Sequence, residues 1–124
     1  MKEKILIVDD NRELREKLKI FLSGKHEVAT AEDGLEALLM LQNGYMPDLI
    51  VSEFIMPLVD GKSLVIRIKE KDFLSHIPVI IITSINLSIA RADLLKSGAS
   101  EYLLKPFGFA ELELCIDRNL KVIA

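Results

Sequence analysis

Acidic, hydroxyl and basic side chains follow four short apolar segments of this sequence. Asp9 and Asp10 follow the first such segment, Glu53 ends a later one, and Thr83 and Lys105 follow two more. Three carboxylates brought together repel one another unless a hard cation, or an ammonium group such as that of Lys105, neutralises them. Because no cysteine or histidine lies at ligand spacing beside them, these oxygen donors favour Mg²⁺ or Mn²⁺ over Zn²⁺.

Each of these residues also has an ordinary structural role. An aspartate pair after a strand often caps a helix, a threonine often stands in a turn, and a Lys-Pro pair is common in loops. Taken one at a time, these roles are the simpler interpretation. Capping does not readily explain four segment ends that each supply a polar group of complementary charge, so the joint occurrence favours a binding site.

Two hydrophobic periods alternate along the chain. Short apolar runs are typical of buried parallel strands, and longer stretches with apolar residues every three or four positions are typical of helices. The predicted strands are 5–8, 28–31, 49–51, 79–82 and 102–104, with the first, third and fourth central, and the predicted helices are about 11–24, 33–43, 63–71, 87–97 and 109–122. We expect Gly24 to end the first helix in the left-handed conformation and Asp33 with Glu36 to form a capping box.

Five such β–α units with right-handed crossovers predict an α/β fold, a five-stranded doubly wound parallel sheet with helices on both faces. Ligands of such folds bind outside the carboxyl ends of the strands, where the polar residues above are expected to meet. The length of 124 residues predicts one domain, residues 1–124.

Composition excludes several classes of protein. The net charge of -3 and the lack of a basic cluster argue against direct nucleic-acid binding. Neither a membrane span nor a leader segment is evident, so we expect a cytoplasmic protein. The single cysteine, Cys115, cannot form an internal disulfide and is expected in the core, while His26 and His76 are expected at the surface and not as metal ligands.

Several motifs together resemble the receiver domains of two-component response regulators. They are DD at 9–10, PDLIVSEFIMP at 47–57 with DG at 60–61, TS at 83–84, and GASEYLLKPF at 98–107. Their order and spacing match over nearly the whole chain. The resemblance implies a flavodoxin-like receiver fold with strand order 2-1-3-4-5 and a cis Lys105–Pro106 bond.

The resemblance also implies roles for individual residues. Asp9, Asp10 and the backbone carbonyl of Ile55 would hold Mg²⁺, together with the carboxylate at position 53. Position 53 would accept a phosphoryl group from a kinase histidine. Thr83 and Lys105 would contact that phosphoryl group, and Tyr102 would switch rotamer with it.

One position departs from the family pattern, because Glu53 stands where the family has its phosphoacceptor aspartate. The extra methylene moves the carboxylate by roughly 1.5 Å, and misplacement by about 1 Å costs on the order of a hundredfold in rate. We therefore expect little or no phosphorylation. The longer side chain would also reach towards Thr83 and Lys105 and imitate a phosphoryl group in part, with less charge and fewer oxygens.

Three interpretations of Glu53 remain open: a mimic of the activated state, a docking or dimerisation module, and a weak phosphoacceptor. The sequence does not say whether Glu53 is natural or engineered. A metal-dependent phosphohydrolase is a remote alternative, since the aspartates are adjacent and no lid segment is present. A flavin or nucleotide carrier is excluded, because the acidic loop at 9–11 would repel a phosphate. We expect a signalling module and not an enzyme.

The resemblance implies a histidine kinase or phosphotransfer protein as partner, docked against the first helix near Arg12, Leu14, Arg15 and Leu18, of which the two leucines are expected in the core. It also implies a signalling face formed by the fourth helix, the fifth strand and the fifth helix, suited to a homodimer. That face includes Ile85, Leu87, Ile89, Arg91, Lys96 and Tyr102. At least one of its three apolar residues at 85–89 is expected to face solvent.

Overall fold

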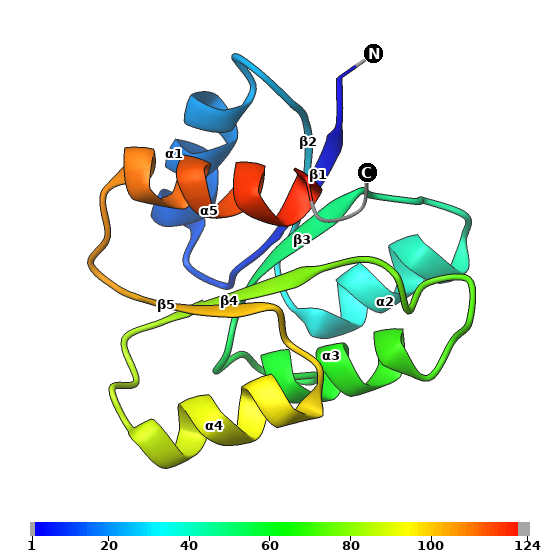
Figure 1. Ribbon diagram of the computed structural model, residues 1–124. Coiled ribbons are helices and arrows are strands. Elements are labelled where there is room, and N and C mark those ends of the chain that lie inside the picture. The colour runs from blue at the N-terminus through cyan, green and yellow to red at the C-terminus, as the bar shows by residue number, and fades with distance from the viewer. Residues whose placement is uncertain (1, 122–124) are drawn as a thin grey trace.

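A five-stranded parallel sheet lies between two layers of helices in the computed structural model, which describes residues 2–121 (Figure 1). Its elements are β1 (Lys4–Val8), α1 (Arg12–Leu22), β2 (Glu27–Ala31), α2 (Gly34–Gln42), β3 (Leu49–Glu53), α3 (Gly61–Lys69), β4 (Val79–Thr83), α4 (Ser88–Ser97), β5 (Glu101–Leu104) and α5 (Phe109–Lys121). The strand order β2-β1-β3-β4-β5 confirms the predicted fold.

The three central strands are the three expected from sequence. Every residue of β3 and β4 is buried, whereas the edge strands β2 and β5 are half-exposed. Alternate side chains of one strand enter opposite faces of the sheet, so Ile5 and Ile7 pack on one side and Leu6 and Val8 on the other. Strands buried on both faces therefore appear in the sequence as continuous apolar runs.

The helices divide unequally between the two faces. On one face α2, α3 and α4 cover a core that includes Leu41, Leu64 and Leu94. On the other face α1 and α5 lie over the sheet, with Leu18 and Ile116 in the core (Figure 1). Within the described residues, no helix combines the length and the apolar composition needed to cross a membrane.

Two predicted helix boundaries are wrong for identifiable reasons. The first helix ends at Leu22 with Ser23 as a right-handed cap, and Gly24 has no positive φ, so its predicted left-handed cap is not formed. The third helix begins two residues early, at Gly61, because the Asp60 side chain accepts a hydrogen bond from the Ser63 amide. Side-chain caps fix helix starts that hydrophobic spacing leaves undefined.

The predicted capping box is formed with a change of partner. Asp33 accepts a hydrogen bond from the Glu36 amide at 2.8 Å. The Glu36 carboxylate accepts one from the Glu32 amide at 3.2 Å, one residue before the cap. The Asp33 cap is therefore formed as predicted, whereas the reciprocal bond of the motif goes to the Glu32 amide and not to the amide of the cap residue.

Candidate functional site

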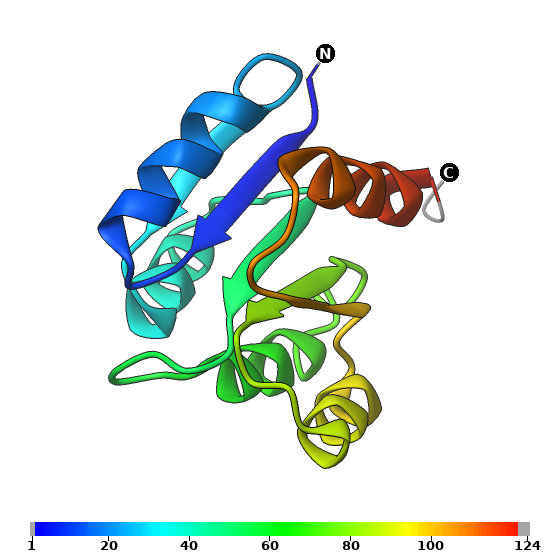
Figure 2. The same ribbon diagram turned by 90° about the vertical axis from the view of Figure 1, so that its left-hand side faces the viewer.

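The carboxyl ends of the central strands bring the polar residues together at one edge of the sheet, where the arrowheads of β1 and β3 point the same way (Figure 2). The Lys105 ammonium group lies between two carboxylates there. Its Nζ donates to Asp9 Oδ2 at 3.0 Å and to Glu53 Oε1 at 2.7 Å. These three residues form the centre of the site.

Asp9 is fully buried and held on both sides. Its Oδ1 accepts a hydrogen bond from the Asn11 amide at 2.8 Å, while Oδ2 faces Lys105. Burial raises the pKa of Asp9, and the negative charge of Glu53 adds to the rise, although the Asn11 amide and Lys105 oppose it. The carboxylate is therefore kept in a place where its charge is costly.

Glu53 already uses both of its carboxylate oxygens. Oε1 accepts from Lys105, and Oε2 accepts from the backbone amides of Phe54 at 2.6 Å and Ile55 at 3.2 Å. The side chain curls back over the turn that follows β3. An ammonium group and two amides surround this carboxylate, which is the kind of donor set that also holds a phosphoryl group.

The ammonium of Lys105 is stabilised by its two partners. Burial by itself would lower the pKa of Lys105, but the hydrogen bonds to Glu53 and Asp9 outweigh burial and raise it. The Lys105–Pro106 bond is cis, as expected from the resemblance. Because its two carboxylate partners raise its pKa, Lys105 stays charged at neutral pH and cancels one of the neighbouring negative charges.

The donor chemistry fits a hard divalent cation. Asp9, Asp10 and Glu53 carry three negative charges against one positive charge on Lys105, and Asp10 is exposed to incoming ions. As a group, the ligand oxygens of the three carboxylates do not come within 4.8 Å of one another in the described part of the chain. Mg²⁺ tolerates this spacing, because it binds through one or two carboxylates and keeps several waters.

Thr83 and Tyr102 meet through the backbone of Ile85 and not at Glu53. The Ile85 amide donates to Thr83 Oγ1 at 3.3 Å, and the Tyr102 hydroxyl donates to the Ile85 carbonyl. Burial raises the pKa of Tyr102. The predicted contact of Glu53 with Lys105 is thus formed, whereas the hydroxyl of Thr83 is engaged by the loop that follows β4.

The loop between β3 and α3 is shaped by close backbone contacts. A Cβ atom on Gly61 would lie 2.5 Å from the Glu53 carbonyl oxygen, so only glycine fits there. Leu58 in the same loop has φ of 69°, in the left-handed region that side chains rarely adopt. The loop that follows Glu53 therefore has a strained backbone at Leu58 and a close backbone contact at Gly61.

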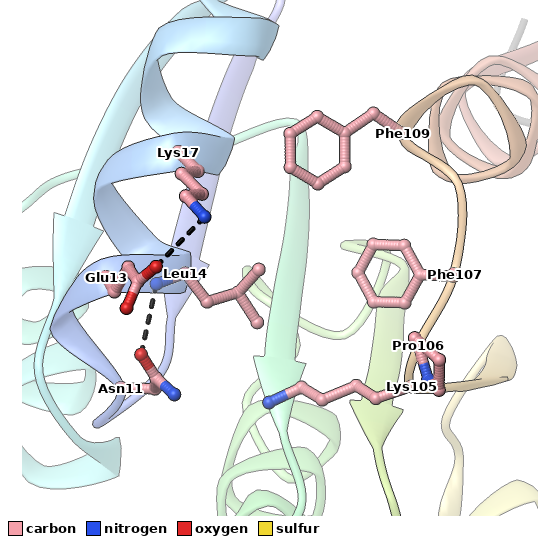
Figure 3. Close-up of a pocket in the computed structure, with 8 residues that line it drawn as sticks. All are labelled: Asn11, Glu13, Leu14, Lys17, Lys105, Pro106, Phe107 and Phe109. Carbon is pink, nitrogen blue, oxygen red and sulfur yellow. Dashed lines mark hydrogen bonds and ion pairs between the residues drawn. The ribbon is translucent and has the colours of Figure 1, made fainter.

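A hollow of about 350 Å³ opens beside Lys105 (Figure 3). Leu14 of α1 faces Phe107 and Phe109 across it, and the Lys105 ammonium lies at one end. The remaining lining residues are Asn11, Glu13, Lys17 and Pro106. The surface next to the acidic site is thus apolar in its centre and charged at its rim.

Two predicted placements are wrong. Arg15 was expected on the surface of the first helix but is buried, where its Nη1 donates to the Asp9 carbonyl at 2.7 Å. Arg15 lies three residues before Leu18 and seven before Leu22, a spacing that places all three on the buried face of the helix. His26 was expected at the surface and is 4% exposed, because its ring packs against α5 and bonds to Glu113.

Other placements agree with the sequence. Cys115 is buried, and burial raises the pKa of its thiol to about 12. His76 is exposed, as are Leu87 and Ile89 at the start of α4. Asp48 lies at the far end of β3 from the site, exposed and bonded to the Lys4 amide.

Comparison with known proteins identifies the family. The sequence model of the response regulator receiver domain matches residues 5–117. Histidine kinase P4 of Formosa agariphila is 41% identical over 120 residues, which are 97% of this chain and 9% of that protein. The probable transcriptional regulator ycf27 of Pyropia yezoensis is 38% identical over 121 residues, 97% of this chain and 48% of the regulator.

Solved structures give the same result. The receiver domain of the Francisella response regulator 1452 superimposes with a TM-score of 0.90 at 30% identity, covering 98% of this chain and 99% of that one. The signal receiver domain of a histidine kinase from Syntrophus aciditrophicus has a TM-score of 0.88 at 31% identity, with 98% and 92% covered. This chain belongs to the response regulator receiver domain family of two-component systems.

Proposed function

We propose that this receiver domain signals with Glu53 in place of a phosphorylated aspartate. The observation that carries the proposal is the occupancy of the Glu53 carboxylate, whose two oxygens meet one ammonium group and two backbone amides. In the family pattern an aspartate at this position attacks a phosphoryl donor. Here the attacking oxygens are displaced by the longer stem and already hydrogen-bonded, so phosphoryl transfer is slow.

Asp9, Asp10 and the carbonyl of Ile55 hold Mg²⁺ or Mn²⁺ in this proposal. The excess of negative charge at the site and the exposure of Asp10 support it. When bound, the cation would neutralise charge on an incoming phosphoryl group. Glu53 contributes little to binding the cation, because Lys105 and two amides hold its oxygens.

Glu53 imitates only part of the phosphorylated state. It holds Lys105, but Thr83 and Tyr102 remain linked to the Ile85 backbone. A carboxylate has one negative charge and two oxygens, whereas a phosphoryl group has three oxygens and a charge of roughly -1.5 to -2. We infer that Glu53 biases the switch and that a bound partner completes the change at Thr83 and Tyr102.

The partner surfaces follow from the same geometry. The hollow beside Lys105 suits a kinase or phosphotransfer protein, because it places apolar contacts from Leu14, Phe107 and Phe109 next to the site. Two relatives of this chain carry the name histidine kinase. On the face of α4, β5 and α5, Leu87 and Ile89 are 59% and 80% exposed and suit a homodimer.

Intact mass after incubation with acetyl phosphate and Mg²⁺ tests the role of Glu53. We expect no change for the protein and a gain of about 80 Da, one phosphoryl group, for Glu53→Asp. Glu53→Asp with Asp10→Asn is the matched control and should gain less, because the cation site is weakened. A gain by the unchanged protein would overturn the proposal and leave a weak phosphoacceptor; no gain by either would show that the loss extends beyond Glu53.

A further inference from the structure

A buried histidine lies at the opposite end of the sheet from the acidic site. His26 precedes β2, and its Nε2 is 3.0 Å from Glu113 Oε1 on α5. Its Nδ1 points towards Glu3, but the distance of 3.6 Å to Glu3 Oε1 is too long for a hydrogen bond. In the described residues, Nδ1 is the buried side-chain polar atom left without a partner.

Neither neutral form of His26 suits these surroundings. A neutral imidazole carries one N–H group and one lone pair. With the hydrogen on Nε2, the ring donates to Glu113 but aims the Nδ1 lone pair at the Glu3 carboxylate. With the hydrogen on Nδ1, the Nε2 lone pair faces Glu113 instead. A second proton or a metal cation removes this conflict.

A third ligand favours the metal cation over the proton. Asp117 follows Glu113 by one helical turn, and the ligand atoms of His26, Glu113 and Asp117 lie within 4.8 Å of one another. Two carboxylates four residues apart on a helix repel each other. A proton on the ring leaves that repulsion between Glu113 and Asp117 partly uncompensated, whereas a divalent cation between all three groups cancels it.

Charge around the cluster points the same way. Glu3, Glu113 and Asp117 bring three negative charges, and the ammonium of Lys25 lies 3.7 Å from Glu113 on an exposed stem. One solvent-exposed lysine balances three negative charges poorly, because water screens its ion pair. The cluster therefore has both a lone pair and an excess of negative charge to offer a cation.

We propose that His26 Nε2, Glu113 and Asp117 form a second cation site, for a transition metal such as Zn²⁺, separate from the Mg²⁺ site. One imidazole and two carboxylates, with water as the fourth ligand, is a donor set that Zn²⁺ accepts and Mg²⁺ does not prefer. Glu3 is the positioning residue, since metal-bound histidines donate their other N–H to a carboxylate. The bound ion ties α5 to the turn before β2.

Calorimetric titration of the protein with ZnCl₂ and with MgCl₂ tests the proposal. We expect one Zn²⁺ bound per chain at this cluster and a higher unfolding temperature in Zn²⁺. The response to Mg²⁺, which belongs to the acidic site, should be the same in the protein and in the two variants described next. His26→Gln and Asp117→Asn should each weaken Zn²⁺ binding at least tenfold and abolish the thermal shift. Asp117 is half-exposed, so its variant folds even where the buried His26 change does not.

Controls separate this site from the second histidine, His76, and from the acidic pocket. His76→Gln removes an exposed histidine and should leave Zn²⁺ affinity unchanged, as should Asp10→Asn. Glu3→Gln should weaken binding about tenfold, the effect typical of a partner of a metal-bound histidine. Zn²⁺ affinity that is equal in the protein, His26→Gln and Asp117→Asn overturns the proposal, and so does binding lost with Asp10→Asn alone.

Discussion

The two ends of the sheet hold polar clusters built around different basic side chains, a lysine and a histidine. At the carboxyl ends, the permanent charge of Lys105 lies between Asp9 and Glu53 at 3.0 and 2.7 Å. At the amino ends, the imidazole of His26 lies between Glu113 at 3.0 Å and Glu3 at 3.6 Å. A lysine neutralises buried carboxylates without help, whereas an imidazole does so only with a proton or a metal.

The backbone differs between the two ends as well. Turns that lead to the amino ends place their positive φ angles at Gly44 and Gly98, where glycine adopts them freely. The loop that leaves the carboxyl end of β3 places a positive φ at Leu58. Strain is tolerated where the chain forms a site and avoided where it only turns.

Replacing Lys105 tests whether it is the centre of the carboxyl-end cluster. Lys105→Met leaves Asp9 and Glu53 as close, uncompensated charges, and we expect a loss of about 3 kcal/mol in the free energy of unfolding. Urea denaturation at neutral pH without divalent cations measures it. Lys25→Met is the control at the amino end, where the lysine is exposed and 3.7 Å from Glu113, and should change stability by less than about 0.5 kcal/mol. Equal losses in the two variants would contradict the contrast between the ends.

Neutralising Asp9 is expected to stabilise the fold. Burial raises the pKa of Asp9, so its contribution to stability is full below the unfolded-state pKa and is lost as the pH rises through the folded-state pKa. At neutral pH the ionised group therefore costs stability, and Asp9→Asn should raise the free energy of unfolding by about 1 kcal/mol while Lys105 keeps Glu53 as partner.

Urea denaturation of the protein and of Asp9→Asn at pH values from about 3 to 8 measures this gain in stability. Buried carboxyl groups with a raised pKa titrate within roughly this range. The gain should shrink towards the acid end, where Asp9 is protonated in both states. Asp48→Asn is the matched variant, because Asp48 is exposed at the amino end of β1 and its amide oxygen still accepts from Lys4. A gain for Asp48→Asn as large as that for Asp9→Asn would show that general charge reduction is responsible.

The fold was predictable because its determinants are local in sequence. Strands such as β4 appear as unbroken apolar runs, and the polar residue after each strand marks the edge where ligands bind. Asp9, Glu53 and Lys105 could therefore be placed together without coordinates. Helix starts were less predictable, because Asp60 caps α3 through a side-chain hydrogen bond that periodicity does not reveal.

The parts that sequence did not predict depend on contacts between distant segments. The sequence predicts His26 at the surface because it lies in a loop between two predicted elements, yet Glu113 of α5 contacts its ring and the residue is buried. The sequence predicts that Glu53 reaches towards Thr83, but in the structure the Thr83 hydroxyl oxygen accepts a hydrogen bond from the backbone amide of Ile85. A side chain with several possible partners chooses among them by geometry, which spacing along the chain does not fix.

Leu58 tests the backbone contrast between the two ends. Its side chain is 78% exposed, so replacing it removes little packing, and a left-handed conformation costs a non-glycine residue on the order of 1 kcal/mol. Leu58→Gly should therefore stabilise the protein, but only by a few tenths of a kcal/mol, because glycine loses more chain entropy on folding, about 0.5 to 1 kcal/mol. Thermal unfolding of the two proteins side by side gives the difference.

Gly44→Ala supplies the reverse change at the other end of the sheet. A Cβ atom on Gly44 would meet no other atom within 4 Å, so any effect comes from the backbone at φ of 99° and not from packing. We expect a loss of about 1 kcal/mol for this variant. Opposite signs for the two variants would show that Leu58 holds a strained conformation that a glycine relieves. A loss of stability in Leu58→Gly would mean that the leucine side chain, despite its exposure, stabilises the loop that carries Glu53.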